Sequence, residues 1–354
     1  MPCVVLAVDP GATGPQPLPP TLADNVPSSG TADPRGAPCP SRAGTVSTRT
    51  SSAEARFERY LRGGHLRVQG WTPWLAFDLF RAFDDVQRQR GTTGNLAEIG
   101  VHHGRSFIAL YLLARGDETA LAVDLFDMQE RNQEAPSGKG DLAVFRRNLV
   151  RHAGDDGRLR VLRGDTRDLA PAALRDAGGG PFRLFHMDGG HTAAIAEHDF
   201  GLAVATLAPG GLVAVDDYFH PVFPGVGDGV RAWLTANRGA GIVPAVVGGG
   251  KVWFCAREDA PAYRGAAETL DMGAEGVKHV REMLGEPVIV LQATENPWNG
   301  RFWRRVLALR PGERRPRSVL FDDLRTRGPR RALRRFLNRT VRRGKQGARR
   351  DRES

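Results

Sequence analysis

Two short stretches of the sequence place acidic side chains where they could bind a metal ion. One apolar run ends in Asp188, with His191 three positions later, and a second ends in Asp216 and Asp217. Both runs are typical of buried strands, and the carboxyl ends of neighbouring parallel strands meet at one edge of a sheet. Three carboxylates grouped there repel one another unless a cation lies among them, and oxygen ligands suit Mg²⁺. We therefore predict Asp188, Asp216 and Asp217 as metal ligands.

The position of His191 indicates a general base. On a turn that faces the same edge, its imidazole could receive the proton of a substrate hydroxyl whose pKa a bound metal has lowered. An unperturbed histidine pKa near ~6.5 suits this role at neutral pH. The alternative is purely structural: Asp188 opens an ordinary turn, and the other acids and the histidine cap the helices that follow.

A glycine-rich turn between Glu98 and Ser106 indicates a cofactor site. Gly100 and Gly104 let the backbone approach a ligand closely, and a helix that begins near Ser106 offers free N–H groups to a charged cofactor. His103, in the same turn, could line the cofactor. Glu98 lies in a buried strand and needs a partner to offset its desolvation, so we assign it to the cofactor, reached either through water or through an ammonium group of the cofactor. A turn that binds no ligand is the alternative.

Further aspartates follow the next strands along the chain. Asp124 ends the second predicted strand, where a carboxylate can accept both ribose hydroxyls of a nucleoside. Asp165 follows the third strand and could reach an adenine edge, or it could cap a helix or turn. Asp188, at the end of the fourth strand, is expected to face the cofactor as well as the metal. The sequence thus predicts a charged cofactor that contains a nucleoside.

Short apolar runs alternate with amphipathic stretches between residues 95 and 256, which is the pattern of a parallel sheet covered by helices on both faces. The last two runs are separated only by Gly248–Gly250, so they should pair as an antiparallel hairpin. The predicted strands are Asn95–Val101, Thr119–Leu125, Leu159–Arg163, Phe182–Asp188, Gly211–Asp216, Ile242–Val247 and Lys251–Ala256. The predicted fold class is α/β, with a Rossmann-like seven-stranded sheet of five parallel strands and a C-terminal antiparallel hairpin.

Composition and periodicity divide the chain into five regions. Residues 1–52 are rich in Pro, Gly, Ser and Thr and are predicted to be disordered. Residues 53–90 form a helical N-terminal cap, and residues 91–257 form the main α/β domain. Residues 258–309 are a C-terminal extension, and residues 310–354 are a basic, Arg-rich tail.

Finer elements are predicted inside these regions. One helical face of the cap carries apolar residues at spacings of three and four, and the nearby aromatic residues are expected to be core. The face consists of Leu75, Leu79, Phe80, Phe83 and Val86, and the aromatic residues are Trp71, Trp74 and Phe77. The extension should hold a helix near 273–284 and a strand over 287–291. The polar loop 127–140 is long enough to be a lid.

The net charge of +10 is concentrated in the tail. Residues 310–354 hold 17 of the 50 Lys and Arg residues but only 5 of the 40 Asp and Glu residues. Within the tail, the stretch 329–345 places four apolar residues on one helical face among arginines. Such a helix could contact an anionic membrane or a nucleic acid, and a solvated tail is the alternative.

Other features narrow the class of protein. No apolar run approaches the ~20 residues needed to cross a bilayer, so a soluble, cytoplasmic protein is expected. The three cysteines, Cys3, Cys39 and Cys255, are too few and too scattered for a disulfide framework. A homo-oligomer is compatible with the sequence, which leaves the oligomeric state open.

With these motifs in place, the chain resembles a bacterial family of metal-dependent class I methyltransferases that use S-adenosylmethionine and include macrocin-type and other sugar-directed O-methyltransferases. The resemblance lies in Ala97–Phe107, Val123–Phe145, Phe185–Asp199 and Leu207–Gly229. It implies S-adenosylmethionine as cofactor, Mg²⁺ on Asp188, Asp216 and Asp217, and a small-molecule or glycan acceptor, with a sugar or natural-product hydroxyl as the methylated group. The Asp-x-x-His spacing is also similar to catechol-type O-methyltransferases, in which a lysine takes the place of His191.

Two other functions stay open at this point. A non-catalytic protein that binds S-adenosylmethionine or RNA would need only the Rossmann-like shell and the basic tail. An NAD-dependent oxidoreductase is disfavoured, because the turn lacks the Gly-x-Gly-x-x-Gly pattern and the sheet should end in a hairpin.

Overall fold

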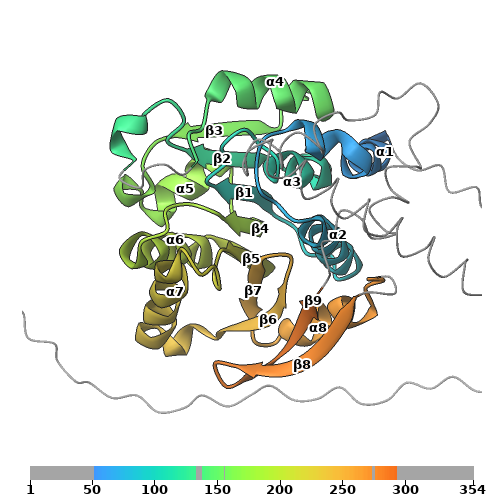
Figure 1. Ribbon diagram of the computed structural model, residues 1–354, viewed down its shortest axis with the longest axis vertical. Helices are drawn as coiled ribbons and strands as arrows, with labels where there is room; N and C mark the ends of the chain where they lie inside the picture. The colour runs from blue at the N-terminus through green and yellow to red at the C-terminus, as the bar shows by residue number, and fades with distance from the viewer. Residues whose placement is uncertain (1–51, 133–137, 155, 273–275, 293–354) are drawn as a thin grey trace, which may run out of the picture. The chain divides into compact units, whose positions relative to one another are not determined.

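One nine-stranded sheet runs through the part of the chain that the computed structural model describes, residues 52–132, 138–154, 156–272 and 276–292 (Figure 1). Its strands, in spatial order, are β3 (Leu159–Arg163), β2 (Ala120–Asp124), β1 (Asn95–Ile99), β4 (Phe182–Met187), β5 (Leu207–Asp216), β7 (Lys251–Ala256), β6 (Ile242–Gly248), β9 (Glu286–Gln292) and β8 (Val277–Met283). For β1 to β7, the parallel and antiparallel directions of the strands agree with the prediction. Strands β3, β2, β1, β4 and β5 are parallel, and β7 is antiparallel to both β5 and β6.

The predicted hairpin is confirmed, and its turn shows why glycine is needed there. Gly249 and Gly250 have φ values of 64° and 77°, so both take the left-handed conformation that a two-residue hairpin turn demands. A Cβ on Gly249 would also lie 2.6 Å from the backbone nitrogen of Ala76. The tip of the hairpin therefore packs directly against the helix that contains Ala76.

The sheet has nine strands, so the prediction of seven was too low. Strand β9 is parallel to β6 and confirms the strand predicted at 287–291, while β8 is antiparallel to β9. The helix predicted near 273–284 is wrong, because Val277–Met283 is β8. Leu284 and Gly285 form a tight turn with φ values of 56° and 77°, and pairing with β9 overrides the weak local preference for helix.

Helices cover both faces of the sheet (Figure 1). The helices are α1 (Ser52–Arg59), α2 (Trp74–Gln89), α3 (Phe107–Leu113), α4 (Leu142–His152), α5 (Pro171–Gly178), α6 (Ala193–Ala205), α7 (Pro224–Ala236) and α8 (Ala260–Thr269). Helices α1, α2, α3 and α8 pack together on one face, and α5, α6 and α7 pack together on the other. Two separate hydrophobic clusters result, one on each face, as expected for a sheet buried on both sides.

Local sequence signals account for several helix ends. The side chain of Asp141 accepts the N–H of Val144 at 2.9 Å and caps the start of α4. Pro171 opens α5, where its missing N–H costs nothing, and Gly179 ends that helix with a φ of 78°. These caps fix where each crossover returns to the sheet, and hence where the strand ends lie.

The cap helix α2 buries the apolar face that its spacing predicts, and all five residues of that face are in the core. Phe77 is core as expected. Trp71 is not, because it precedes α2 and its side chain is 72% exposed, beside the ring of His102 at 5.5 Å. The expectation that Trp71 belongs to the core is therefore wrong.

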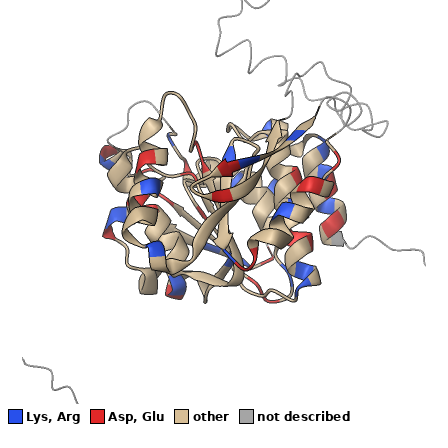
Figure 2. Cartoon of the chain, turned by 90° about the horizontal axis from the view of Figure 1, so that it is seen from below, with Lys and Arg blue, Asp and Glu red and all other residues tan. Residues whose placement is uncertain are grey.

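Several predictions concern residues that the structure does not describe. The N-terminal segment up to residue 51, the basic tail 310–354 with its helix at 329–345, and residues 133–137 of the predicted lid lie outside the described residues. Among the described residues, no helix is long and apolar enough to cross a membrane. Figure 2 shows acidic and basic residues interspersed along the helices.

Candidate active site

Four polar residues, three of them buried and one half-buried, form a row across the middle of the sheet, at the carboxyl ends of the parallel strands. Glu98 of β1 is opposite His186 of β4 in the strand register, and Asp216 of β5 is opposite Lys251 of β7. Because side chains alternate along a strand, all four point to the face that α2 covers. The ring of Phe80 from α2 contacts His186 edge-on, with 5.5 Å between ring centroids. We call Glu98, His186, Asp216 and Lys251 the polar row.

Contacts within the polar row run from one end to the other. His186 Nδ1 lies 3.4 Å from Glu98 Oε2, and His186 Nε2 lies 3.7 Å from Asp216 Oδ2. The Lys251 ammonium forms a hydrogen-bonded ion pair with Asp216 Oδ2. Burial alone would raise the pKa of Asp216, but the Lys251 ammonium and the neighbouring His186 together hold that pKa below its ordinary value. Asp216 thus has a counterion, Lys251, within the chain.

The structure does not gather the three predicted metal ligands into one group. Among the described residues, two sets of potential ligand atoms lie within 4.8 Å of one another. One contains His186, Asp188 and Asp216, and the other contains Asp188, His191 and Asp217. Asp188 belongs to both sets, whereas Asp216 and Asp217 fall in different ones. Two carboxylates of the second set, together with water and a substrate oxygen, would suit Mg²⁺.

His191 is held by contacts on two sides. Its Nε2 lies 3.5 Å from Asp217 Oδ2, and its ring stacks on Phe223 at 3.9 Å and 12°. The ring of His220 stacks on Phe223 as well, at 4.8 Å. Asp217 has a φ of 55°, a left-handed conformation that is strained for a residue with a Cβ. The stack and the carboxylate together fix the plane of the His191 imidazole beside Asp217.

Asp188 is an unusual acid in this group. Burial and the neighbouring Asp216 carboxylate raise its pKa well above the ordinary value for an aspartate. A cation placed between Asp188 and its neighbours would reverse this effect, since it would favour the ionised form. The electrostatics of Asp188 therefore favour either a proton or a metal ion at this position.

Packing alone requires glycine at two positions of the turn, whether or not a ligand binds there. Gly100 has a φ of 83°, and a Cβ there would overlap the carbonyl oxygen of Asp188. Gly104 has a φ of 90°, and a Cβ there would lie 2.7 Å from the ring of Phe145. Ser106 donates to Glu98 Oε1 at 2.6 Å. The turn thus brings the ends of β1 and β4 into contact and fixes the Glu98 carboxylate.

Asp124 organises the backbone at the end of β2. It accepts the N–H of His102 at 2.7 Å and the N–H of Phe126 at 2.6 Å, so it joins the glycine turn to the next loop. Burial raises its pKa above the ordinary value, and these backbone hydrogen bonds oppose the rise. A Cβ on Gly140 would lie 2.9 Å from Asp124 Oδ1, so the backbone at Gly140 passes close to this carboxylate.

Asp165 has a simpler environment. Its carboxylate accepts hydrogen bonds from the backbone and guanidinium of Arg167, at 2.6 to 3.0 Å. These bonds lower its pKa. The structural alternative, a cap for the turn that begins at Asp165, is realised in this geometry.

His102 and His103 lie side by side on the glycine turn, with 3.9 Å between ring centroids. Burial lowers the pKa of both, and that of His102 falls to about 4. Trp71 borders His102, so three rings lie next to one another at the predicted cofactor turn. Neutral, partly apolar rings of this kind suit contacts with a planar base.

Two residues of the site were missed or misplaced by the sequence analysis. Lys251 was not singled out, and Trp71 was assigned to the core. One signal was available for Lys251, since a lysine at the start of an apolar strand is rare and this chain has few lysines.

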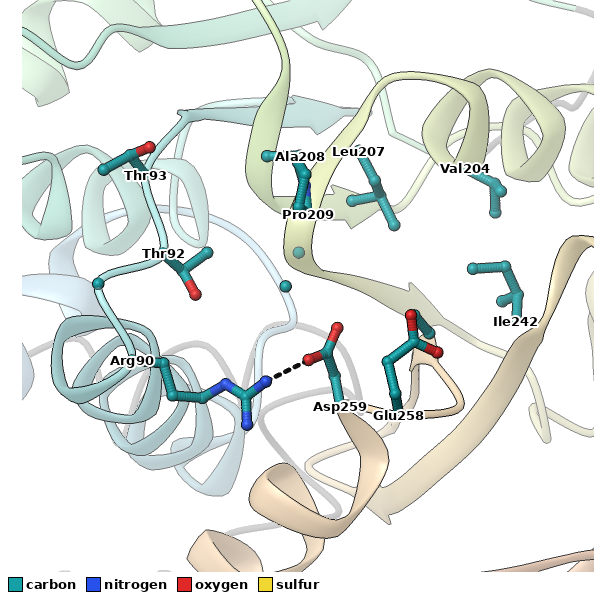
Figure 3. Close-up of a pocket in the computed structure, with 14 residues that line it drawn as sticks. Arg90, Thr92, Thr93, Val204, Leu207, Ala208, Pro209, Ile242, Glu258 and Asp259 are labelled. Carbon is teal, nitrogen blue, oxygen red and sulfur yellow. Dashed lines mark hydrogen bonds and ion pairs between the residues drawn. The ribbon is translucent and has the colours of Figure 1, made fainter. Parts of the chain in front are cut away.

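A cavity of about 520 Å³ opens at the amino ends of the parallel strands, opposite the carboxyl ends that hold the candidate site (Figure 3). It lies beside the residues that precede β1 and those that begin β5, and the ion pair between Arg90 and Asp259, at 2.5 Å, lines it. None of the predicted site residues contributes to its lining. The chemistry-bearing residues are gathered instead at the carboxyl ends of the strands, where open α/β sheets bind ligands.

Comparison with known proteins identifies the domain that contains this site. Residues 97–218, from β1 to the end of β5 and two residues beyond, match the family model described as a methyltransferase domain. Residues 97–218 are therefore a methyltransferase domain on a Rossmann-like fold, in which the five parallel strands are followed by the antiparallel pair of β7 and β6. No curated protein matches the chain significantly.

Three of the solved structures that are similar to the chain are named as O-methyltransferases. NovP is 19% identical, with 51% of this chain and 79% of NovP covered and a TM-score of 0.43. CalS11, a TDP-rhamnose 3'-O-methyltransferase, is 18% identical, with 57% and 94% covered and a TM-score of 0.38. An O-methyltransferase from Bacillus cereus is 18% identical, with 59% and 91% covered and a TM-score of 0.38. Similarity at this level carries no conclusion about the acceptor.

Proposed function

We propose that the protein is an O-methyltransferase that transfers the methyl group of S-adenosylmethionine to a hydroxyl of a sugar or natural-product acceptor, with help from a divalent cation. The observation that carries this proposal is the grouping of Asp188, His191 and Asp217 within 4.8 Å, next to the glycine turn of a methyltransferase domain. Acids and a base that meet beside a nucleoside site suit transfer to oxygen.

The cofactor half of the site is proposed to lie over the glycine turn. Glu98, fixed by Ser106, would pair with the ammonium group of the cofactor, and Asp124 would accept ribose hydroxyls with the lone pairs that its two backbone bonds leave. The backbone of Gly100 to Gly104, His103 and Asp188 would line the cofactor, and Asp165 would lie toward the base.

The acceptor half is proposed to lie between Asp188 and Asp217. These carboxylates would hold a divalent cation, Mg²⁺ in the first instance, which would lower the pKa of the acceptor hydroxyl. His191 would receive the hydroxyl proton on Nε2, while Asp217 and Phe223 keep its ring in place. S-adenosylmethionine, when bound, would supply the methyl group to the acceptor oxygen and would leave as S-adenosylhomocysteine. The hydroxyl proton would be held on His191 Nε2 and would pass from there to water.

The chain's own residues supply most of what this reaction needs. The polar row and the glycine turn would hold the cofactor, and the ends of β4 and β5 would hold the acceptor, so the two reactants would meet in a fixed orientation. The resemblance in Phe185–Asp199 and Leu207–Gly229 favours a hydroxyl on a sugar or natural product.

Calorimetric titration with S-adenosylhomocysteine, with and without Mg²⁺, tests the proposal without knowledge of the acceptor. We expect binding, a loss of at least about tenfold in affinity in Asp124→Ala, and a Mg²⁺ response that Asp217→Ala removes. Asp127→Ala, an exposed aspartate three positions from Asp124, is the matched control and should bind normally. A folded protein that binds no S-adenosylhomocysteine would contradict the proposal and favour a different ligand.

A further inference from the structure

Lys251 has a position that few lysines take. It opens β7, which is central in the sheet, and only 1% of the residue is exposed. Its register partner across the antiparallel pair is Asp216, and its ammonium donates to Asp216 Oδ2. A buried ammonium has a large desolvation cost, so a fixed carboxylate partner is required.

The other oxygen of Asp216 is also engaged. Asp216 Oδ1 accepts the backbone N–H of Asp217 at 3.0 Å, so both oxygens already have donors from the chain. His186, whose two ring nitrogens have no hydrogen-bond partner among the described residues, lies on the third side of the carboxylate. A metal ion at Asp216 would have to share this space with the ammonium group of Lys251.

We propose that Lys251 takes the place of a divalent cation at Asp216, so that the metal ion of the proposed reaction binds to Asp188 and Asp217 without Asp216. The inference rests on the proposed function, because it concerns the metal ligands of that site. A divalent ion beside a buried ammonium is strongly repelled, since water screens neither charge well there. The sequence expectation of three aspartate ligands is thereby reduced to two.

Lys251 also acts as a positioning residue. It holds the carboxylate of Asp216, and that carboxylate holds the N–H of Asp217. Asp217 is in the left-handed conformation that turns the chain away from β5, and its own carboxylate lies beside His191. The strained residue Asp217 is supported directly by Asp216 Oδ1, a contact that does not involve the oxygen paired with Lys251.

Titration of the full chain with Mn²⁺ tests this inference. Binding is measured from the electron paramagnetic resonance signal of the free ion. The variants are Asp216→Asn, Lys251→Met and the double variant, with Asp188→Asn as the reference for a true ligand. We expect Asp216→Asn to bind Mn²⁺ within about threefold of the wild type and Asp188→Asn to bind at least about tenfold more weakly. Lys251→Met, which frees Asp216, should bind at least about tenfold more tightly, and the double variant should lose this gain.

Two outcomes would overturn the inference: a loss of tenfold or more in Asp216→Asn, or an unchanged Mn²⁺ affinity in folded Lys251→Met. If Lys251→Met does not fold, Asp216→Asn decides alone, because it keeps the lysine and nearly the same shape. S-adenosylhomocysteine is titrated in parallel with each variant. Failure of the wild type to bind S-adenosylhomocysteine rejects the proposed function, whereas the order of Mn²⁺ affinities tests Lys251 independently.

Discussion

Nε2 of His191 lies 3.5 Å from Oδ2 of Asp217, although the two residues come from loops that follow different strands. The carboxylate orients the imidazole and would stabilise its protonated form once a proton has been accepted. Phe223, stacked on the ring at 3.9 Å, prevents it from rotating away. The pair thus has the geometry of a general base with its orienting acid.

His191→Asn should abolish proton acceptance and leave cofactor binding intact. With an acceptor found by screening for release of S-adenosylhomocysteine, turnover should fall by about 100-fold or more, while the affinity for S-adenosylhomocysteine stays within about twofold. His220→Asn is the matched control, because its ring stacks on the same Phe223 from further away. Equal turnover in His191→Asn and the wild type would exclude His191 as the base.

Gly100→Ala should unfold the glycine turn. Its φ of 83° is strained for alanine, and the new Cβ would also overlap the carbonyl oxygen of Asp188. We expect a loss of about 3 kcal/mol or more in the free energy of unfolding, measured by urea denaturation. Gly157→Ala has nearly the same φ, 82°, with nothing within 4 Å of its Cβ, and should lose only about 1 kcal/mol. Similar losses in the two variants would show that contact with Asp188 is unimportant.

Arg183→Met should destabilise the fold strongly, because Arg183 is a fully buried anchor at the start of β4. It pairs with Asp84 at 2.8 Å and with Glu118 at 2.9 Å, and the variant would leave both acids without this partner. The expected loss is about 3–5 kcal/mol in the free energy of unfolding, measured by urea denaturation. Arg231→Met removes an exposed pair with Asp228 and should cost less than about 1 kcal/mol.

Asp199 should make stability depend on pH. Burial raises its pKa to about 7, above the ordinary value, so the folded chain keeps a proton that the unfolded chain releases near pH ~4. Its contribution is therefore fully present below pH ~4 and is lost as the pH rises through 7, at a cost of roughly 4 kcal/mol by pH 8.

Urea denaturation at pH 5 and pH 8 measures this effect. Asp199→Asn should flatten the change between the two values and make the protein more stable than the wild type at pH 8. Asp176→Asn, an exposed acid on α5, should leave the pH dependence as it is. A wild type that is more stable at pH 8 than at pH 5, or an Asp199→Asn curve parallel to it, would contradict the prediction.

The sequence by itself determined the seven-stranded core of the fold and the acids at its strand ends. Apolar runs, glycine turns and the short Gly248–Gly250 connection are local signals, and the rule that parallel strands present their carboxyl ends at one edge does the rest. For the same reason Asp188, Asp216 and Asp217 could be placed near one another without a structure.

Only the tertiary structure decided that Asp188 and Asp217 lie together beside His191, whereas Asp216 pairs with Lys251. The ion pair of Asp216 with Lys251 depends on the register between β5 and β7, and a shift of one residue would turn the lysine to the other face. The pairing of β9 with β6, and the exposure of Trp71, likewise depend on which elements pack against each other. Such contacts join residues far apart in the chain, so no local pattern encodes them.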